Sequence, residues 1–333
     1  MTKIAVMGAG SWGTTFAKLL ADAGNDVTIW SRRQEVADEI NEDGRNGDYL
    51  PGINLPSELK ASSSAAETLA GAEMVFIAVP SQSLRSILED WGSSIPSSAL
   101  LVSLMKGVEK DTGMRMSEVL ADVTRADSSR IVVISGPNLS LEIAAEQPAA
   151  AVAACTDADA ATRVAAASTN SYFTTFTNTD VIGTEFGGIL KNLIAVAIGI
   201  VNGVGYGQNT KASIMTRGLA EISSFAEAFG ADRATMVGLA GLGDLIATSE
   251  SPLSRNHKAG EMLGKGYSLR EVNKRLSQTA EGLTSVGPIL RLARDKGVAM
   301  PIVEQVQAVL DGRMNPKDIA PHLTKKNSGP QGE

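Results

Sequence analysis

The chain has 333 residues, ordinary hydrophobic content and a formal net charge of −7 at pH 7. This length predicts about two domains, and the negative charge argues against nucleic-acid binding, which requires a basic face. One cysteine, Cys155, excludes an intramolecular disulfide, and two histidines make a His-rich metal site or a His-based triad implausible, so we expect no metal. Because no signal peptide or membrane-length apolar run is evident, we expect a cytoplasmic protein without integral membrane contact.

The N-terminal segment predicts a strand over residues 3–7, a helix over 14–23 and a second strand over 27–30. Between the first strand and the helix lies Gly-Ala-Gly-Ser-Trp-Gly, residues 8–13, which is a G-x-G-x-x-G sequence. Strand, glycine turn, helix and strand within about thirty residues form the context in which this sequence binds a dinucleotide. We therefore predict a Rossmann-type domain.

Each glycine of this turn has its own physical role. Gly8 permits the tight turn, Gly10 lets the backbone approach a pyrophosphate, and Gly13 lets the helix pack closely on the strand. The N-terminus of the helix would then face the phosphates with free N–H groups and a positive dipole. The alternative is a plain surface turn.

The end of the second strand predicts which cofactor is bound. NAD sites usually place Asp or Glu there to bind the ribose hydroxyls, whereas this chain has Ser31, Arg32 and Arg33. Two guanidinium groups suit the additional phosphate of NADP, which a carboxylate would repel. We predict that NADP is preferred and that NAD is a possible second cofactor. The alternative is that the arginines are only solvated surface charges.

Further strands follow at the spacing of βα units. They are expected over residues 74–79, 99–104, 130–134, 149–155 and 172–176. Lys106 comes just after the second of these, and Gly136 and Asn138 come just after the third. Ligands of open α/β sheets lie at the carboxyl ends of strands, so we expect these residues to line a site. A solvated loop charge is the alternative for Lys106.

The remaining sequence predicts only helices. The fold class is therefore α/β, with a doubly wound Rossmann-type sheet over residues 1–183, an all-α domain over 184–324 and a mobile tail over 325–333. The first helix of the second part carries Lys191 and Asn192 in an otherwise apolar sequence. Because an unpaired buried ammonium is costly, Lys191 either reaches water from a helix edge or is held for chemistry.

Two polar motifs follow in the helical part. Asp244 lies in an apolar, glycine-rich turn, where a carboxylate needs a partner, and Lys191 is a candidate. Ser254, Arg255 and Asn256 offer a hydroxyl, a guanidinium and an amide in consecutive positions, which suits a phosphate ester. A simple turn residue and an ordinary polar loop are the respective alternatives.

The motifs as a set resemble the bacterial-type NAD(P)-dependent glycerol-3-phosphate dehydrogenases. They are the glycine turn at 8–13, Ser-Gly-Pro-Asn at 135–138, Leu-Lys-Asn at 190–192, Gly-Leu-Gly-Asp at 241–244 and Ser-Arg-Asn at 254–256. The resemblance covers the chain up to about residue 320. It implies a reversible reduction of dihydroxyacetone phosphate to sn-glycerol 3-phosphate with NADP or NAD, a supply of this product to phospholipid synthesis, and a homodimer.

The resemblance also implies roles for single residues. Lys191 matches the catalytic lysine of the family, which donates a proton in reduction and accepts one in oxidation, and Lys106 and Asp244 match further catalytic positions. The implied substrate-binding residues are Lys106, Gly136, Asn138, Lys191, Asn192, Asp244, Ser254, Arg255 and Asn256. The implied cofactor-binding residues are Gly8, Gly10, Ser11, Trp12, Gly13, Arg32, Arg33, Lys106, Ser140, Arg255, Thr279 and Glu281.

Two other classes of protein share parts of this pattern. A reductase of the hydroxyacid dehydrogenase or ketopantoate reductase type could have the glycine turn and the lysine, but a phosphate-free substrate has little use for residues 254–256. A non-catalytic NADP-binding regulatory module would not need Lys191, Lys106 and Asp244 together.

Overall fold

The computed structural model describes residues 1–276 and 280–319. Within these residues eight strands form one sheet in the order β3-β2-β1-β4-β5-β6-β7-β8. The strands are β1 (Lys3–Met7), β2 (Asp26–Trp30), β3 (Lys60–Ser62), β4 (Met74–Ile77), β5 (Leu100–Ser103), β6 (Ile131–Ser135), β7 (Ala149–Ala154) and β8 (Phe173–Asn178). All neighbouring strands run parallel except β6 and β7, which are antiparallel.

Helices cover both faces of the sheet, so its central strands are apolar on both sides. In β1, Ile4 and Val6 belong to one apolar cluster and Ala5 and Met7 to another. Such strands read as continuous apolar runs because neither face meets water. The first face carries α1 (Ser11–Asp22), α2 (Gln34–Asp43), α6 (Ser140–Ala144) and α7 (Ala158–Ala167), and the second carries α3 (Ala65–Leu69), α4 (Leu84–Trp91) and α5 (Met116–Thr124).

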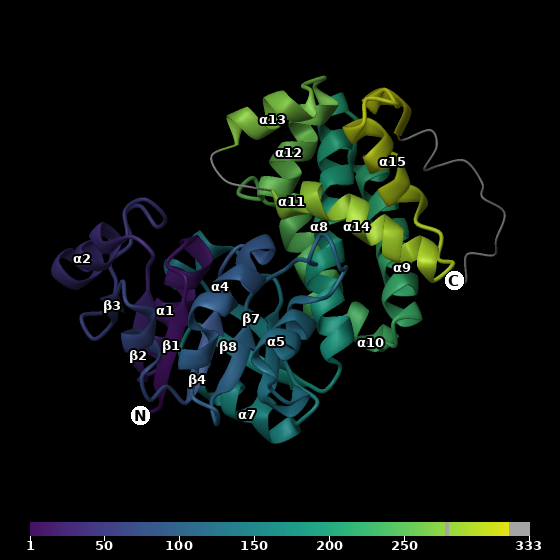
Figure 1. Cartoon of the computed structure of the whole chain (residues 1–333). Coiled ribbons are helices and arrows are strands. Elements are labelled where there is room, and N and C mark those ends of the chain that lie inside the picture. Colours follow the sequence, from purple (N-terminus) through teal and green to yellow (C-terminus); the bar gives the residue numbers. More distant parts are fainter. Residues whose placement is uncertain (277–279, 320–333) are drawn as a thin grey trace.

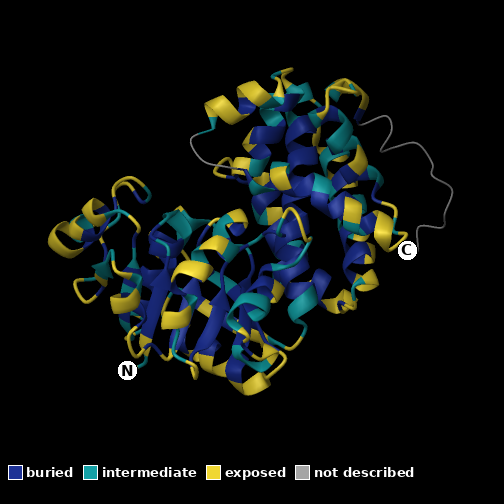
Figure 2. Ribbon diagram, viewed as in Figure 1, coloured by how far each residue is buried: buried dark blue, intermediate teal, exposed yellow. Residues whose placement is uncertain are grey.

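The second half of the described chain is helical and packs around one central helix, α8 (Figures 1 and 2). Its helices are α8 (Val181–Val204), α9 (Gln208–Ala228), α10 (Arg233–Met236), α11 (Asp244–Glu250), α12 (Arg255–Gly264), α13 (Leu269–Arg275), α14 (Glu281–Asp295) and α15 (Pro301–Leu310). A π-helical turn, Leu239–Gly243, precedes α11. Short 3-10 turns lie at Ser81–Ser83, Gly92–Ser94, Ser128–Arg130 and Pro316–Asp318.

Helix α8 is long and apolar enough to span a membrane, but 83% of its most apolar stretch is buried inside the protein. Figure 2 shows it as a dark blue rod enclosed by helices whose outer sides are exposed. Its side chains form the core of the helical half, together with residues of α9, α14 and α15. Its apolar character is therefore that of a core helix.

Glycines set the close crossing of α8 and α12. Gly199 and Gly203 of α8 face Gly260 and Gly264 of α12. A Cβ atom added to Gly260 would lie 2.9 Å from the Cα atom of Gly199 and closer still to the carbonyl oxygen of Val196. The two backbones are therefore in direct contact, which side chains at these positions would prevent.

Several boundaries differ from those expected from the sequence. The first helix begins at Ser11, so the end of the glycine turn is itself helical. Helix α8 begins at Val181, three residues before the expected start, because the Asp180 side chain caps it by accepting from the N–H of Gly183. The three-residue edge strand β3 was not predicted, because it is short and polar. Thr279 and the expected tail at 325–333 lie outside the described residues.

Candidate active site

The centre of the site is one carboxylate held between two ammonium groups. Asp244 accepts a hydrogen bond from Lys191 Nζ on Oδ1 at 2.9 Å and one from Lys106 Nζ on Oδ2 at 2.6 Å. Lys106 Nζ also donates to the carbonyl oxygen of Gly136 at 2.9 Å. The predicted pairing of Asp244 with Lys191 is thus present, and Lys106 joins it from the sheet domain.

Thr248 completes this cluster and was not predicted. Its Oγ1 accepts a hydrogen bond from Lys191 Nζ and donates one to Asp244 Oδ1 at 3.1 Å. The residue lies one helical turn after Asp244 on α11, so the i,i+4 spacing places both side chains on one face. The only indication of Thr248 in the sequence is a hydroxyl residue four positions after Asp244, and such a spacing is common in helices without any functional role.

Burial determines the acid–base behaviour of this cluster. The side chain of Lys191 is 8% exposed and that of Asp244 is 1% exposed. Burial is the main cause of a lowered pKa of Lys191; Asp244 opposes the shift, Lys106 adds to it, and the net pKa is about 8. An amine with such a pKa can both donate and accept a proton near neutral pH, as a general acid–base group must.

Small residues allow the elements to meet closely. Gly188 lies one turn before Lys191 on α8, and a Cβ atom there would collide with Ser135 Oγ and touch the side chain of Lys106 at 3.4 Å. A Cβ atom on Gly187 would lie 2.6 Å from the carbonyl oxygen of Ala240 in the π-helical turn. These two glycines therefore bring the end of the sheet and the turn before Asp244 against α8.

The turn after β6 presents polar groups to the same region. Gly136 has φ +152°, and a Cβ atom there would lie 2.9 Å from the Cα atom of Ala151. Asn138 is half-buried, and in the described part of the chain neither of its buried side-chain amide atoms has a hydrogen-bond partner. Because buried polar groups are normally paired, Asn138 is suited to a polar ligand.

The predicted polar residues at the start of α12 lie beside α8. Asn256 Nδ2 donates to Asn192 Oδ1 at 2.8 Å, and Asn256 Oδ1 accepts from the N–H of Gly282 at 3.0 Å. Asn192 Nδ2 donates to the carbonyl of Gly188 at 3.3 Å, so both ends of this amide are engaged within the protein. Ser254 Oγ caps α12 by accepting from the N–H of His257.

Carboxylates usually lie fully exposed on the protein surface, but Glu281 does not. Burial raises its pKa, and the positive charge of Arg255 opposes that shift. Ser81 Oγ, just after β4, lies 3.5 Å from Glu281 Oε1. Glu281 therefore links the start of α14 to the sheet domain.

The glycine turn fits a dinucleotide pyrophosphate. A Cβ atom on Gly13 would overlap the carbonyl oxygen of Gly8, so α1 lies directly on the turn. A Cβ atom on Gly10 would instead enter open space, and among the described residues no side chain caps the first N–H groups of α1. In the described residues the buried Trp12 Nε1–H has no acceptor. An uncapped helix N-terminus beside open space is a ready anion site.

Three further predicted cofactor residues, Ser140, Arg32 and Arg33, follow strands of the sheet domain or flank α1. The carbonyl of Ser140 accepts from Thr15 Oγ1 of α1 at 3.2 Å, which places Ser140 next to that helix. Arg32 is exposed after β2, and Arg33 is half-buried. Arg33 Nη2 is 2.7 Å from Asp48 Oδ2, so one of the two predicted phosphate ligands has a carboxylate partner.

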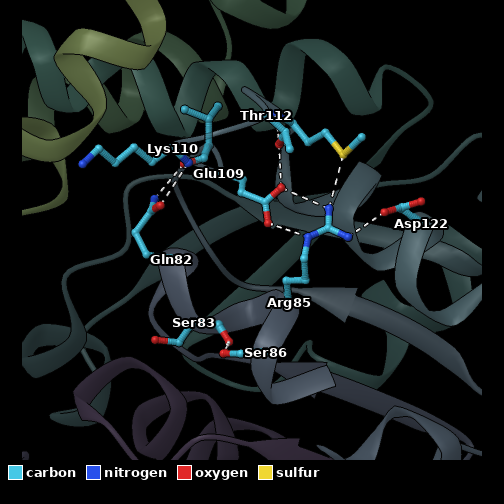
Figure 3. A network of polar contacts seen from close by, with 10 residues as sticks. Gln82, Ser83, Arg85, Ser86, Glu109, Lys110, Thr112 and Asp122 are labelled. Atoms are coloured by element: carbon cyan, nitrogen blue, oxygen red, sulfur yellow. Dashed lines mark hydrogen bonds and ion pairs between the residues drawn. The ribbon is translucent and has the colours of Figure 1, made fainter. Parts of the chain in front are cut away.

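A polar network holds the loop that carries Lys106 (Figure 3). Arg85 of α4 donates to Glu109 at 2.8 Å and 3.0 Å and to Asp122 at 2.6 Å. Gln82 donates to the carbonyl of Val108 at 2.8 Å and accepts from the N–H of Lys110 at 3.0 Å. The loop after β5 is therefore fixed to α4 on one side.

The helical half holds the same loop from its other side. Arg291 Nη2 of α14 donates to the carbonyl of Lys110 at 2.5 Å. The loop thus contacts both halves of the described chain, and Lys106 lies where they meet. None of these contacts was foreseen, because Arg85, Gln82 and Arg291 come from three separate segments.

The class of protein follows from three features together. They are a Rossmann-type sheet, a glycine turn followed by an uncapped helix N-terminus, and a buried lysine–carboxylate cluster between two domains. This combination is that of a nicotinamide-dependent dehydrogenase. Residues 3–161 match the family model for the NAD-dependent glycerol-3-phosphate dehydrogenase N-terminus, and residues 180–321 match that for its C-terminus. The chain belongs to the glycerol-3-phosphate dehydrogenase family, as its motifs suggested.

Similar proteins agree along nearly the whole chain. Glycerol-3-phosphate dehydrogenase [NAD(P)+] of Leifsonia xyli subsp. xyli is 62% identical over 98% of this chain and 89% of its own length. The protein of the same name from Corynebacterium glutamicum is 54% identical over 96% of each chain. The crystal structure of glycerol-3-phosphate dehydrogenase from Coxiella burnetii has a TM-score of 0.91 at 33% identity and covers 97% of this chain and 98% of its own.

Proposed function

We propose that this chain catalyses the reversible NAD(P)H-dependent reduction of dihydroxyacetone phosphate to sn-glycerol 3-phosphate. The observation that carries the proposal is the buried Asp244 carboxylate between Lys191 and Lys106, where the two halves of the chain meet. Membership of the family supports the choice of substrate.

The reaction needs a proton at the oxygen that becomes a hydroxyl. When bound, NADPH or NADH supplies hydride to the carbonyl carbon of the substrate. Lys191 stabilises the negative charge that develops on the carbonyl oxygen and transfers a proton to it from Nζ, and in oxidation it accepts that proton. Asp244 orients Lys191, and Lys106 adds a second positive charge to the same region.

The phosphate group of the substrate is proposed to bind at the start of α12. This helix has ten residues, and its N-terminus carries a partial positive charge that favours anions. Arg255 and Asn256 are the first two residues of the helix, directly after its cap Ser254. The contact of Asn256 with Asn192 connects this end of the site to α8 and hence to Lys191.

Several finer properties belong to the same proposal. We propose that NADP is preferred over NAD, that the enzyme is a cytoplasmic homodimer, and that its product supplies phospholipid synthesis. Residues 1–183 are proposed as the cofactor domain and 184–324 as the substrate domain. The two arginines after β2 support the choice of cofactor, because guanidinium groups bind phosphate well.

The proposal is tested with purified full-length protein and dihydroxyacetone phosphate, by following the loss of NADPH or NADH absorbance. We expect oxidation of both cofactors, faster with NADPH, and little with unphosphorylated dihydroxyacetone. Binding of NADPH without any oxidation would contradict the proposed activity.

Lys191→Ala tests the proposed acid–base residue. Turnover should fall roughly 10²- to 10⁴-fold while NADPH affinity stays nearly unchanged, because the lost group acts on the substrate. Lys274→Ala, on the exposed side of α13, is the matched control and should keep full turnover. An equal loss of NADPH binding in Lys191→Ala would make Lys191 a structural residue.

A further inference from the structure

The segment after α2 folds back onto the glycine turn. Asn46 is fully buried and donates from Nδ2 to the carbonyl of Ala9 at 3.0 Å and to Thr14 Oγ1 at 2.8 Å. The N–H of Leu50 donates to the carbonyl of Asn46 at 2.8 Å, which closes a turn over residues 46–50. This turn is therefore fixed relative to the backbone that would hold the pyrophosphate.

Asp48 lies within this turn and pairs with Arg33. The Asp48 Oδ2 atom is 2.7 Å from Arg33 Nη2, and the Arg33 guanidinium lies 5.9 Å from the centre of the Tyr49 ring. A second carboxylate, Glu35, is looser, with Oε1 at 3.8 Å from Arg33 Nε. Asp48 and Glu35 both lie against Arg33, so two negative charges stand beside the positive charges of Arg32 and Arg33.

The position of Asp48 bears on whether the protein binds NAD or NADP. NAD sites usually have a carboxylate at the end of the second strand, where it accepts from the ribose hydroxyls. Residues 31–33 have none, but the fold brings the Asp48 carboxylate, fifteen residues farther along the chain, to within 2.7 Å of the Arg33 guanidinium. A carboxylate here competes with the additional phosphate of NADP for Arg33 and repels that phosphate.

We propose that Asp48 is a specificity-determining residue that moderates the preference for NADP and maintains the use of NAD. This inference deepens the proposed function and rests on its assignment of Arg32 and Arg33 to the phosphate of NADP. Asp48 lowers the affinity for the phosphorylated cofactor by occupying Arg33, and it supplies the carboxylate that the unphosphorylated ribose can use.

The test compares Asp48→Asn with Glu35→Gln and the unchanged protein. Dissociation constants for NADP⁺, NAD⁺, 2′,5′-ADP and 5′-AMP are measured by calorimetry at low and high salt. Asp48→Asn should tighten NADP⁺ and 2′,5′-ADP roughly three- to tenfold at low salt, because one negative charge near the bound phosphate would be removed. Its affinity for NAD⁺ and 5′-AMP should stay equal or weaken.

Glu35→Gln controls for the mere loss of a negative charge and should change NADP⁺ affinity less than twofold. Thermal unfolding shows whether either variant is misfolded, which is not expected because both side chains are more than 60% exposed. Equal changes for NADP⁺ and NAD⁺ in Asp48→Asn, or equal effects of the two variants, would overturn the inference. These binding measurements are independent of turnover, so failure of the proposed activity would be seen separately.

Discussion

Lys191 Nζ donates a hydrogen bond to Asp244 Oδ1 at 2.9 Å across 53 positions of the sequence, in a region closed to water. A buried pair of this kind is costly to break, because the remaining charge would be left uncompensated. The second oxygen of Asp244 is engaged by Lys106. One carboxylate therefore orients both cations, and it does so from a helix that begins with that same residue.

The proposed acid–base role of Lys191 predicts how each direction of the reaction depends on pH. Because burial lowers its pKa to about 8, the ammonium form is lost as the pH rises through that value. The rate of reduction, which needs the ammonium, should therefore fall above about pH 8, and the rate of oxidation should rise there. Pre-steady-state rates of both directions between pH 6 and 10 would check this.

Asp244→Asn provides the control for this assignment. Removing the negative charge that favours the ammonium should move the inflection to lower pH, besides lowering the rate. An inflection that stays in place would show that another group controls the profile.

Gly188→Ala should impair catalysis without replacing any polar side chain of the site. Its Cβ atom would collide with Ser135 Oγ and contact the Lys106 side chain at 3.4 Å, so Ser135 must shift and the packing around Lys106 changes. A displacement of about 1 Å can cost up to about 100-fold in rate, so we expect kcat to fall roughly ten- to a hundredfold. Gly287→Ala is the matched control on α14, where the nearest atom is 3.9 Å away, and it should keep full activity.

Glu221 should make stability depend on pH. Its buried carboxylate accepts from the N–H groups of Ile302 and Val303 at the start of α15, and burial raises its pKa to about 7. The folded state thus binds the proton more tightly than the unfolded state, so Glu221 contributes most stability below about pH 4.5. That contribution is lost as the pH rises through about 7. The difference between the pKa of Glu221 in the folded protein and its ordinary value of 4.5 corresponds to about 3 kcal/mol in the free energy of unfolding.

Urea unfolding of the wild type and Glu221→Gln between pH 4.5 and 8 checks this. The free energy of unfolding of the wild type should fall relative to that of Glu221→Gln across this range. Glu227→Gln, an exposed position on the same helix as Glu221, should run parallel to the wild type. Parallel curves for Glu221→Gln as well would contradict the prediction.

The parts of the fold that depend on local sequence were predictable. Buried strands such as β1 and β4 are continuous apolar runs, and the spacing of Gly8, Gly10 and Gly13 has a meaning within thirty residues. The pairing of Asp244 with Lys191 could be anticipated because a buried charge requires a partner. Family motifs then suggested which residues share one site.

The parts that depend on distant segments were not predictable in this way. Nothing near Arg33 in the sequence shows that Asp48 returns to it, since the return depends on the burial of Asn46 against the glycine turn. The glycine-rich segment before Asp244 was interpreted as a turn, but it is π-helical, because its contacts with α8 set its backbone. Thr248 gave no signal apart from its spacing.

The glycine contacts between α8 and α12 fix the distance between Lys191 on one helix and the start of the other. Lys191 lies two turns before Gly199 on α8, and residues 254–256 lie just over one turn before Gly260 on α12. Since the two backbones touch, no side chain can adjust the separation between Lys191 and the start of α12, which are the proposed sites for the substrate carbonyl and phosphate. If the substrate binds as proposed, main-chain contacts alone set the distance between its two binding points, and a longer or shorter sugar phosphate should reach only one of them.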